Sequence, residues 1–517
     1  MGSFYERVNK QSTISDERED AVSRAAMDKW IFRILLVLMG VMPLIVLANV
    51  EEVISPLIAN VDILSSGVKG ELFTHYKAFF VLVVTIITGL LLLAKIIFMN
   101  GTIRKTWINY VLGIFVVAIV LSTVFSPNIS ITLNGQYNRS DGAISWLCYV
   151  ALMFIAMNIE YPKKVVNYVM YTMMPFIYIN LFIITMNFVG KDLLQNSFVK
   201  SVVSSTLPEG SSLGEGSQLL GTLNQWNYMS GMFAMMTVMY LAWAISSKKW
   251  SETIIGAVTA SAAIAVMFMS LSTSGFLTVV VLAIVLLVAL FMVENKKQAI
   301  AAVAVFLVIA APSFHALASK NERVWNESLG FLMDAKPYAP EVVSLLPGPN
   351  VAHASEQVFE LPVLPERAFS AGTGRTYIWD KTLDLVKDRP LLGYGGDSLA
   401  YNFPHYNIDA RAGMTDEHII TDKAHNQYMG ILFGFGIIGF AAFVILMVVA
   451  GISTITSMFK KSWALFIVSI FVLAFFAQAM FNDSLPGITP IAFVLFGVLF
   501  ALKQQFGEEQ LLDGRDN

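Results

Sequence analysis

One polar stretch of the sequence combines an arginine, a glycine-rich turn and a histidine, and it ends where a long apolar run begins. His425 comes directly before that run, so its imidazole is expected at a membrane interface. A side chain that titrates near neutrality suits a general base that takes a proton from a hydroxyl. Arg375 is planar and permanently charged, which suits bidentate binding of a diphosphate. The turn Pro390-Leu-Leu-Gly-Tyr-Gly-Gly396 can present backbone N–H groups to an anion.

Each of these features also has an ordinary structural interpretation. An interfacial histidine can cap a helix or contact lipid headgroups, and a single arginine can form a surface ion pair, here with Asp380 or Asp384. Most glycine-rich turns are only turns. Taken one at a time, these patterns therefore leave both interpretations open.

Two further polar segments carry candidate binding residues. Arg139 is the basic residue of the short loop Gly135-Gln-Tyr-Asn-Arg-Ser-Asp-Gly142, where it can bind an anion or pair with Asp141. Asn224 and Asn227 stand at the start of a later apolar run, and their amides can hydrogen-bond sugar hydroxyls. Asn224 can equally cap the helix that begins there.

Several other kinds of chemistry have no pattern in this sequence. It contains no paired His/Cys spacing, no His-Glu-x-x-His and no Walker lysine, so neither a metal, a nucleotide nor another cofactor is predicted. The net charge of −3 gives no support for nucleic acid as a partner. Cys148 is the single cysteine, which excludes an intrachain disulfide.

The composition assigns the chain to the membrane proteins. Of 517 residues, 56% are hydrophobic and only 14% are charged, and the mean hydropathy is +0.65. Because a hydrocarbon core of roughly 30 Å needs about 20 helical residues, the sequence predicts an all-α, polytopic protein with about twelve spans. The predicted spans are 30–50, 78–99, 107–125, 144–159, 165–189, 227–246, 253–271, 275–293, 299–318, 427–450, 462–482 and 486–502.

Basic doublets predict the topology. Alternate short links carry Arg104-Lys105, Lys163-Lys164, Lys248-Lys249, Lys296-Lys297 and Lys460-Lys461. Cytoplasmic links are rich in Lys and Arg, so both termini are expected in the cytoplasm. The predicted parts are a tail at 1–29, nine spans within 30–318, a large extracytoplasmic loop at 319–426, three spans within 427–502, and a tail at 503–517.

The second half of the large loop has a helical pattern. Thr373 can cap a helix over 375–387 that Pro390 ends. Helical spacing puts Arg375, Trp379, Leu383 and Val386 on one stripe, which is predicted to pack down.

The motifs together resemble a known family. Gly374-Arg375 with Trp379, Pro390-Leu-Leu-Gly393-Tyr-Gly395, His425-Asn-x-Tyr428 and Gly436-Ile-Ile-Gly439 lie in and after a large outer loop between the ninth and tenth spans. Loops 135–142 and 221–228 resemble weaker signatures of the same family. This set is similar to the O-antigen ligase and polymerase superfamily of bacterial membrane glycosyltransferases.

The resemblance implies an enzyme of the bacterial cytoplasmic membrane that works at its outer face without a metal or nucleotide sugar. The donor would be a glycan on undecaprenyl diphosphate, and the acceptor a hydroxyl of a glycolipid, a protein or a glycan. Arg375 would bind the donor diphosphate, and His425 would activate the acceptor for attack with inversion. Weaker candidates for glycan or acceptor contacts are Asn224, Asn227, Tyr394, Asn426 and Tyr428.

The chain departs from the family pattern at one place. Family members commonly carry a second arginine after a serine between the seventh and eighth spans, but Ser272-Thr-Ser-Gly275 has glycine there. Arg139 is a candidate for the missing charge.

Three other functions remain open on sequence grounds. A polymerase would join lipid-linked repeat units by the same chemistry. A transporter or flippase is compatible with about twelve spans, although few ionisable residues lie near span centres and no inverted halves are visible. A docking role for the outer loop is the third.

Overall fold

The computed structural model describes residues 2–53, 66–209, 218–223, 225–333, 335, 337–338, 375–405 and 421–513, with the side chains of 2–15 and 506–513 excepted. This part of the chain is mostly helical, as predicted. Its long helices are α1 (Gly2–Val41), α2 (His75–Phe98), α3 (Ile108–Val124), α5 (Ala143–Met157), α6 (Val165–Phe188), α8 (Trp226–Ser246), α9 (Trp250–Met269), α10 (Thr273–Met292), α11 (Lys296–Lys320), α14 (Arg375–Asp388), α17 (Gln427–Phe459), α18 (Trp463–Gln478) and α19 (Thr489–Asp513).

Shorter elements connect the long helices. They are η1 (Met42–Leu44), β1 (Asn49–Val53), β2 (Gly67–Glu71), α4 (Ile129–Asn134), η3 (Leu193–Gln195), α7 (Ser197–Val203), α12 (Arg323–Asn326), α13 (Leu329–Leu332) and α15 (Leu399–Asn402). β1 and β2 pair as an antiparallel hairpin in which Asn49 lies opposite Glu71 and Val53 opposite Gly67.

The chain is a multi-pass membrane protein. Within the described residues, seven helices are long and apolar enough to span a bilayer, namely α2, α6, α8, α9, α10, α11 and α17. Four shorter apolar helices, α3, α5, α18 and the Thr489–Gln505 part of α19, lie at predicted spans. The exact count of twelve is thus not established by these lengths.

The first predicted span is wrong at its end. Helix α1 stops at Val41, and residues 49 and 50 already belong to strand β1. Pro43 explains the stop, because proline lacks the backbone N–H that a continuing helix needs and clashes with the preceding turn.

The bundle is built around α8. Its sequence is apolar on every side, and 89% of the residues in its most apolar stretch are buried, mainly against α9, α10 and α18. Small residues permit close approach: a Cβ at Gly231 would lie 2.6 Å from the Gln478 side chain. A second group joins α5 to α19 and α3 to α17.

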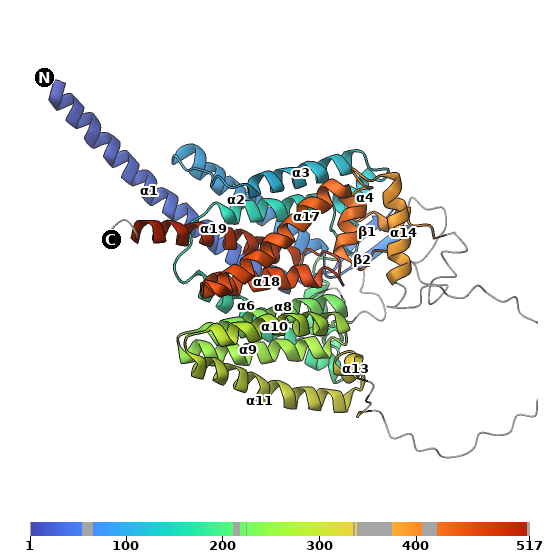
Figure 1. The fold of residues 1–517 in the computed structure, drawn as a ribbon. Helices are drawn as coiled ribbons and strands as arrows, with labels where there is room; N and C mark the ends of the chain where they lie inside the picture. The colour runs from blue at the N-terminus through green and yellow to red at the C-terminus, as the bar shows by residue number, and fades with distance from the viewer. Residues whose placement is uncertain are drawn as a thin grey trace, which may run out of the picture.

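The two ends of the bundle differ (Figure 1). α4, α14 and the β1–β2 hairpin lie at one end, whereas the start of α1 and the end of α19 lie at the other. The connections with polar candidate residues therefore gather at one end.

Helix α17 is broken at Gly436, and the break receives the glycine-rich turn. Gly436 has φ +64°, and the two halves of α17 meet there. The N–H groups of Tyr394 and Gly395 donate to the carbonyls of Phe433 and Gly434, at 2.9 and 2.8 Å. The anion-binding use that the sequence left open for these two turn donors is therefore excluded, because α17 already occupies them.

Alanine at Gly436 is expected to lower the free energy of unfolding by about 2 to 5 kcal/mol. The left-handed φ strains any residue with a Cβ, and this Cβ would overlap the carbonyl of Leu391. Thermal unfolding in detergent measures the loss. Gly451→Ala is the matched control, because Gly451 lies in the same helix and the nearest atom to its added Cβ would be Leu473 Cδ1, at 4.0 Å. An equal loss in both variants would contradict the explanation.

Helix α14 confirms the predicted helix in the large loop, but its buried face is different. Tyr377, Ile378 and Thr382 are buried, whereas Leu383 of the predicted stripe is 43% exposed. Aromatic packing decides the rotation, because Tyr377 joins Phe403 in a small core with α15 and α17. Thr373 and Gly374 lie outside the described residues.

Candidate functional site

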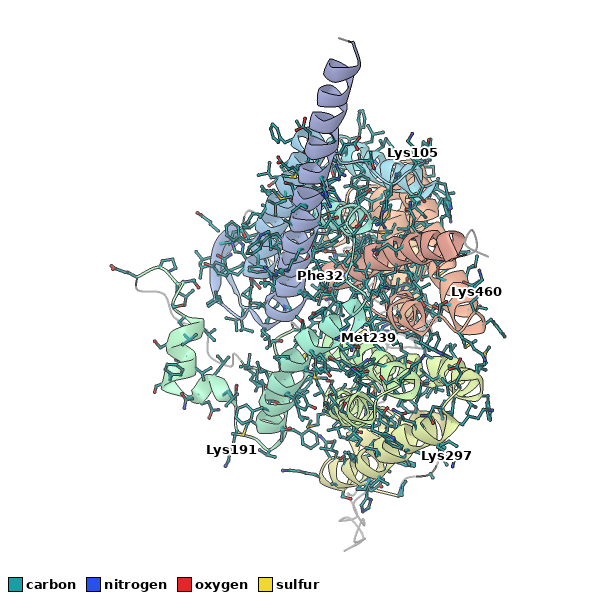
Figure 2. The ribbon with its side chains drawn as sticks, turned by 90° about the vertical axis from the view of Figure 1, so that its left-hand side faces the viewer. Phe32, Lys105, Lys191, Met239, Lys297 and Lys460 are labelled. Carbon is teal, nitrogen blue, oxygen red and sulfur yellow. The ribbon has the colours of Figure 1, made fainter. Side chains whose placement is uncertain are left out.

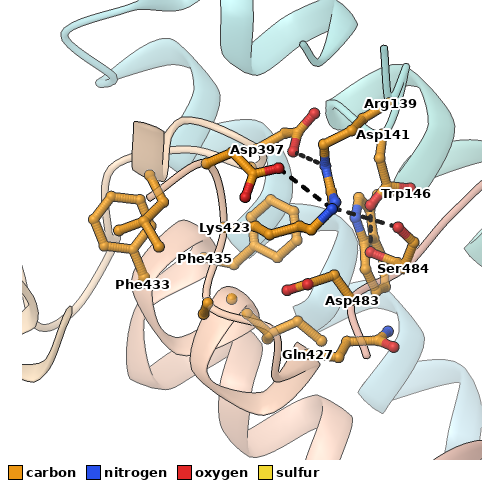
Figure 3. Close-up of a pocket in the computed structure, with 16 residues that line it drawn as sticks. Arg139, Asp141, Trp146, Asp397, Lys423, Gln427, Phe433, Phe435, Asp483 and Ser484 are labelled. Carbon is orange, nitrogen blue, oxygen red and sulfur yellow. Dashed lines mark hydrogen bonds and ion pairs between the residues drawn. The ribbon is translucent and has the colours of Figure 1, made fainter. Parts of the chain in front are cut away.

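Four segments that are distant in the sequence enclose a charged cavity at the polar end of the bundle (Figure 3). The cavity measures about 40 Å³, which is room for water but not for a sugar. Its charged lining residues are Arg139, Asp141, Asp397, Asp422, Lys423 and Asp483. Only Arg139 of these was predicted as a site residue.

Arg139 is held by a buried ion pair. Its Nε lies 2.5 Å from Asp397 Oδ1, and the side chains of both residues are almost fully buried. Its Nη1 donates to the Tyr228 hydroxyl at 3.2 Å, and its Nη2 donates to the Ser484 carbonyl at 3.4 Å. Figure 3 shows the guanidinium between Asp397 and Ser484. The ion-pair partner is thus Asp397, which directly follows the glycine-rich turn, and not Asp141.

Charge compensation keeps Arg139 ionised. Burial alone would lower its pKa, but Asp397, Tyr228, Asp483 and Asp141 together raise the pKa well above the ordinary value. A guanidinium with this many partners is fixed in position.

Asp141 has a separate role beside this pair. Its carboxylate accepts hydrogen bonds from the Tyr149 hydroxyl at 2.9 Å and from the Ser484 hydroxyl. Burial raises the pKa of Asp141 to about 7, against the opposing charge of Arg139. Asp141 therefore ties the loop before α5 to the connection between α18 and α19.

Gln136 joins the turn to the histidine segment. Its backbone N–H donates to Asp397 Oδ2 at 2.7 Å. Its side-chain amide donates to the carbonyls of Asp397 and Asp422, each at 3.1 Å. The loop that carries Arg139 thus positions the segment that carries His425.

Lys423 is a second buried cation, which sequence reasoning missed. Its Nζ lies 3.3 Å from Asp422 Oδ2, 3.5 Å from Gln225 Oε1 and 5.5 Å from the centre of the Tyr228 ring. Burial opposes its charge, but Tyr228 and Asp422 raise the pKa of Lys423 above its ordinary value. A lysine two residues before the candidate base was the available signal.

His425 stands at the start of α17 in a strained backbone conformation, with φ +51°. Its Nε2 lies 4.0 Å from Asp422 Oδ1, which is too long for a hydrogen bond. Its Nδ1 is buried and has no partner among the described residues. Burial lowers the pKa of His425; Asp483 opposes that shift, whereas Lys423 and Arg375 reinforce it. The imidazole is therefore neutral at pH 7 and able to accept a proton.

Arg375 and His425 are brought together by Trp379 and by one carboxylate. Trp379 of α14 donates through Nε1 to the carbonyl of Ala424 at 2.8 Å, directly before His425. Asp483 interacts electrostatically with Arg375 and with His425, and its Oδ2 is buried without a partner in the described chain. Asp483 follows α18, so no local pattern pointed to it.

Arg375 is only half-buried at the first turn of α14 and forms no hydrogen bond or ion pair with another described residue. Burial lowers its pKa, and Asp483 opposes that shift. Neither Arg375 nor His425 lines the small charged cavity. Both stand beside it, where their side chains remain partly accessible.

The weaker candidates mostly have structural contacts. The Asn426 side chain caps α17 by accepting from the N–H of Met429 at 3.2 Å. Tyr428 donates to the carbonyl of Phe476 at 2.8 Å, inside the bundle. Tyr394 stacks on Phe433 with ring centres 4.9 Å apart.

The amide pair at the start of α8 is also engaged. Asn227 Nδ2 donates to Asn482 Oδ1 at 2.8 Å, and Asn482 Nδ2 returns a bond to the Asn227 carbonyl at 3.0 Å. Asn224 lies outside the described residues.

Segment 272–275 packs too tightly for an arginine. A Cβ at Gly275 would overlap the Ser230 side chain of α8, and the Ser274 hydroxyl accepts from Gln478 Nε2 at 3.1 Å. Glycine thus permits contact between α10 and α8, and the buried cations of the charged cavity, Arg139 and Lys423, come from other segments.

Fold and site together define a multi-pass membrane protein whose buried charged residues meet at one end of a helical bundle. Residues 255–444 match the family model described as O-antigen ligase. This match confirms the resemblance to the O-antigen ligase superfamily, and it indicates a membrane glycosyltransferase of ligase or polymerase type. A search of curated proteins found no match. The matched range contains Arg375 and His425 and excludes Arg139 and Asp483.

Proposed function

We propose that this protein moves a glycan from an undecaprenyl-diphosphate carrier to an acceptor hydroxyl at the outer face of the bacterial cytoplasmic membrane. One observation carries the proposal. Arg375 and His425, a cation and a neutral base, stand beside the same charged cavity, and Asp483, which lines that cavity and has a buried Oδ2 without a hydrogen-bond partner among the described residues, interacts electrostatically with both. An anionic donor and a hydroxyl acceptor need such a pair of groups side by side.

His425 is the proposed base. It takes the proton of the acceptor hydroxyl, and the oxygen attacks the anomeric carbon from the face opposite the diphosphate. The bond from that carbon to the phosphate oxygen breaks, and its electron pair leaves on the diphosphate, so the anomeric configuration inverts. Asp483 stabilises the imidazolium that forms, and Arg375 neutralises the charge that develops on the leaving group.

Arg139 and Lys423 have a different proposed role. Arg139 divides its guanidinium among Asp397, Tyr228 and Ser484, which favours positioning of the site over direct contact with the donor phosphates. Lys423 is buried beside Asp422 and fixes the segment that ends at His425. Arg375 is then the accessible cation for the donor.

The basic doublets support the proposed orientation. Lys105 and Lys460 belong to links between spans and lie at the margin of the molecule in the view of Figure 2. Links with such doublets are typically retained in the cytoplasm, which supports an orientation with the polar end and His425 outside and both termini inside.

A transport function has less support. A carrier would place ionisable residues near the middle of its spans. Among the described spans, the buried lysines of α2 are Lys77 and Lys95, which lie near the two ends of that helix. Each has fixed protein partners: Lys77 donates to the carbonyl of Thr222 at 2.7 Å, and Lys95 pairs with Asp28 at 2.6 Å.

Arg375→Ala is expected to reduce transfer by about 10²- to 10³-fold, because one electrostatic donor at the leaving group is lost. Arg375→Lys should recover part of the activity, since it keeps the charge but not the bidentate geometry. The measurement is the amount and size of glycan on the carrier lipid in a deletion strain complemented with each variant. Arg389→Ala is the control, because Arg389 contacts the Phe125 carbonyl outside the site.

The same extraction separates ligase from polymerase. A defective ligase leaves long glycan on the carrier, whereas a defective polymerase leaves single repeat units. Normal glycan processing by a well-inserted Arg375→Ala variant would contradict the proposed site.

A further inference from the structure

A second cavity lies between α3, α17 and α19, toward the end of the molecule that carries the two termini. It measures about 430 Å³, roughly ten times the charged cavity at the other end. Its polar lining includes Arg104, Ser453 and Lys503, and its apolar lining includes Trp107, Ile452 and Phe500. No acidic side chain lines it among the described residues, so its charge is positive.

Neutral groups hold both cations in place. Arg104 donates through Nη1 to the Ala501 carbonyl at 2.9 Å, and its backbone N–H donates to Asn158 Oδ1 at 2.7 Å. Lys503 Nζ donates to the Ser453 hydroxyl at 2.6 Å. Neither side chain forms an ion pair within the described part of the chain, although Arg104 also lines a neighbouring pocket that contains Asp28 and Glu160. Within the cavity itself, no carboxylate faces the two positive charges.

A third cation strengthens the positive field. Lys460, which follows α17, lies close enough to Lys503 for the two charges to repel each other. Like charges gathered around a cavity are costly unless an anion joins them. The cavity is thus electrostatically prepared for a negatively charged group.

The surface beside the cavity is apolar. Trp107 is 56% exposed at the start of α3, where an aromatic ring suits the boundary between headgroups and hydrocarbon. Further along the spans, Tyr110 and Ile114 of α3 and Val448 and Ile452 of α17 are exposed side chains. Acyl chains can lie against these residues while a headgroup occupies the cavity.

We infer that this cavity binds the headgroup of an anionic phospholipid, with its phosphate between Arg104 and Lys503 and its acyl chains along α3 and α17. The length of the helices and the basic links put the cavity at the cytoplasmic interface, where anionic lipids attract basic residues. A free phosphate ion would leave the adjoining apolar surface unused. The inference does not rest on the transfer reaction, because the cavity is at the opposite end from His425.

Binding is tested on full-length protein purified in detergent. Phosphatidylglycerol and phosphatidylcholine with the same acyl chains are added, and native mass spectrometry counts the retained lipids while thermal unfolding reports their effect. Wild-type protein is expected to retain phosphatidylglycerol preferentially and to unfold at a higher temperature with it. Equal retention and equal unfolding temperatures for the two lipids would overturn the inference.

Variants locate the site. Arg104→Gln combined with Lys503→Gln should weaken phosphatidylglycerol binding by about thirtyfold, since two basic contacts are lost. Lys105→Gln combined with Lys461→Gln is the matched control, because both residues are exposed lysines of basic links, Lys105 directly follows Arg104, and neither lines the cavity. An equal loss in the control would assign binding to general charge and overturn the site.

Two further measurements keep the result decisive. If the double variant does not fold, Lys503→Gln alone is compared with Lys461→Gln, because Lys503 loses only one hydrogen bond, to Ser453. Inorganic phosphate is added in place of lipid to wild-type protein. Stabilisation by phosphate equal to that by phosphatidylglycerol would assign the cavity to a free anion and contradict the lipid assignment.

Discussion

Replacing His425 with alanine is expected to lower glycan transfer by about 10²- to 10⁴-fold while the protein still inserts in the membrane. The imidazole is the proposed base. Its Nδ1 has no hydrogen-bond partner among the described residues, so the substitution breaks no structural hydrogen bond of this nitrogen. Transfer is measured as glycan leaving the carrier lipid in membranes, with the level of each variant quantified in parallel.

A second substitution separates chemistry from backbone strain. His425 has φ +51°, a conformation that asparagine tolerates better than alanine does. His425→Asn should therefore be as inactive as His425→Ala but more stable. His405→Gln is the control, because His405 belongs to the same loop and its Nε2 contacts the Ala400 carbonyl. Substantial transfer by His425→Asn would contradict the assigned base.

The pH dependence of transfer follows from the environment of His425. Burial lowers its pKa below 6.5. Lys423 and Arg375 reinforce this shift, whereas Asp483 and Asp422 oppose it. A base acts in its neutral form, so transfer should be constant near pH 7 and fall only as the pH drops below the lowered pKa. A fall that begins above pH 7 on acidification would contradict this protonation state.

Asp397→Asn is expected to destabilise the protein by about 3 to 5 kcal/mol, because it leaves the buried Arg139 guanidinium without its counter-ion. Asparagine tolerates φ +59° at this position and keeps an acceptor for the Gln136 N–H, so the charge is the main change. The loss is measured as the shift of the unfolding midpoint in detergent.

The double variant Arg139→Met with Asp397→Asn is compared with the single variant Asp397→Asn. Removing both charges of a buried pair is often neutral or stabilising, so the double variant should recover the stability that Asp397→Asn loses. If Arg139 only positions the site, transfer recovers as well. Recovery of stability without transfer would show instead that Arg139 contacts the donor, contrary to the positioning role proposed above.

Half of the described non-glycine residues with positive φ lie in the same region. Ser140, Asp397 and His425 are non-glycine residues with positive φ, and each belongs to a segment of the charged site. Such conformations cost energy and persist where surrounding contacts impose them. These contacts hold the candidate site in a defined conformation, as the proposed reaction would require.

The sequence alone predicted the helices well. A chain in a bilayer must satisfy its backbone hydrogen bonds within each span, so a long apolar run specifies a helix with little help from its neighbours. Helix α14 was predictable for a similar reason, since its pattern and Pro390 are local. His425 and Arg375 stood out because a titratable and a charged side chain are conspicuous beside apolar runs.

Only the tertiary structure could decide which charged residues meet. Asp397 and Asp483 come from distant segments, and no periodicity links either to Arg139 or His425. The sequence left open whether the donors of the glycine-rich turn bind an anion, and the structure shows the Tyr394 and Gly395 N–H groups bound to carbonyls of α17, next to its break at Gly436. Local patterns specify where the chain is helical, whereas the partners of a buried charge depend on packing between elements that are far apart in the sequence.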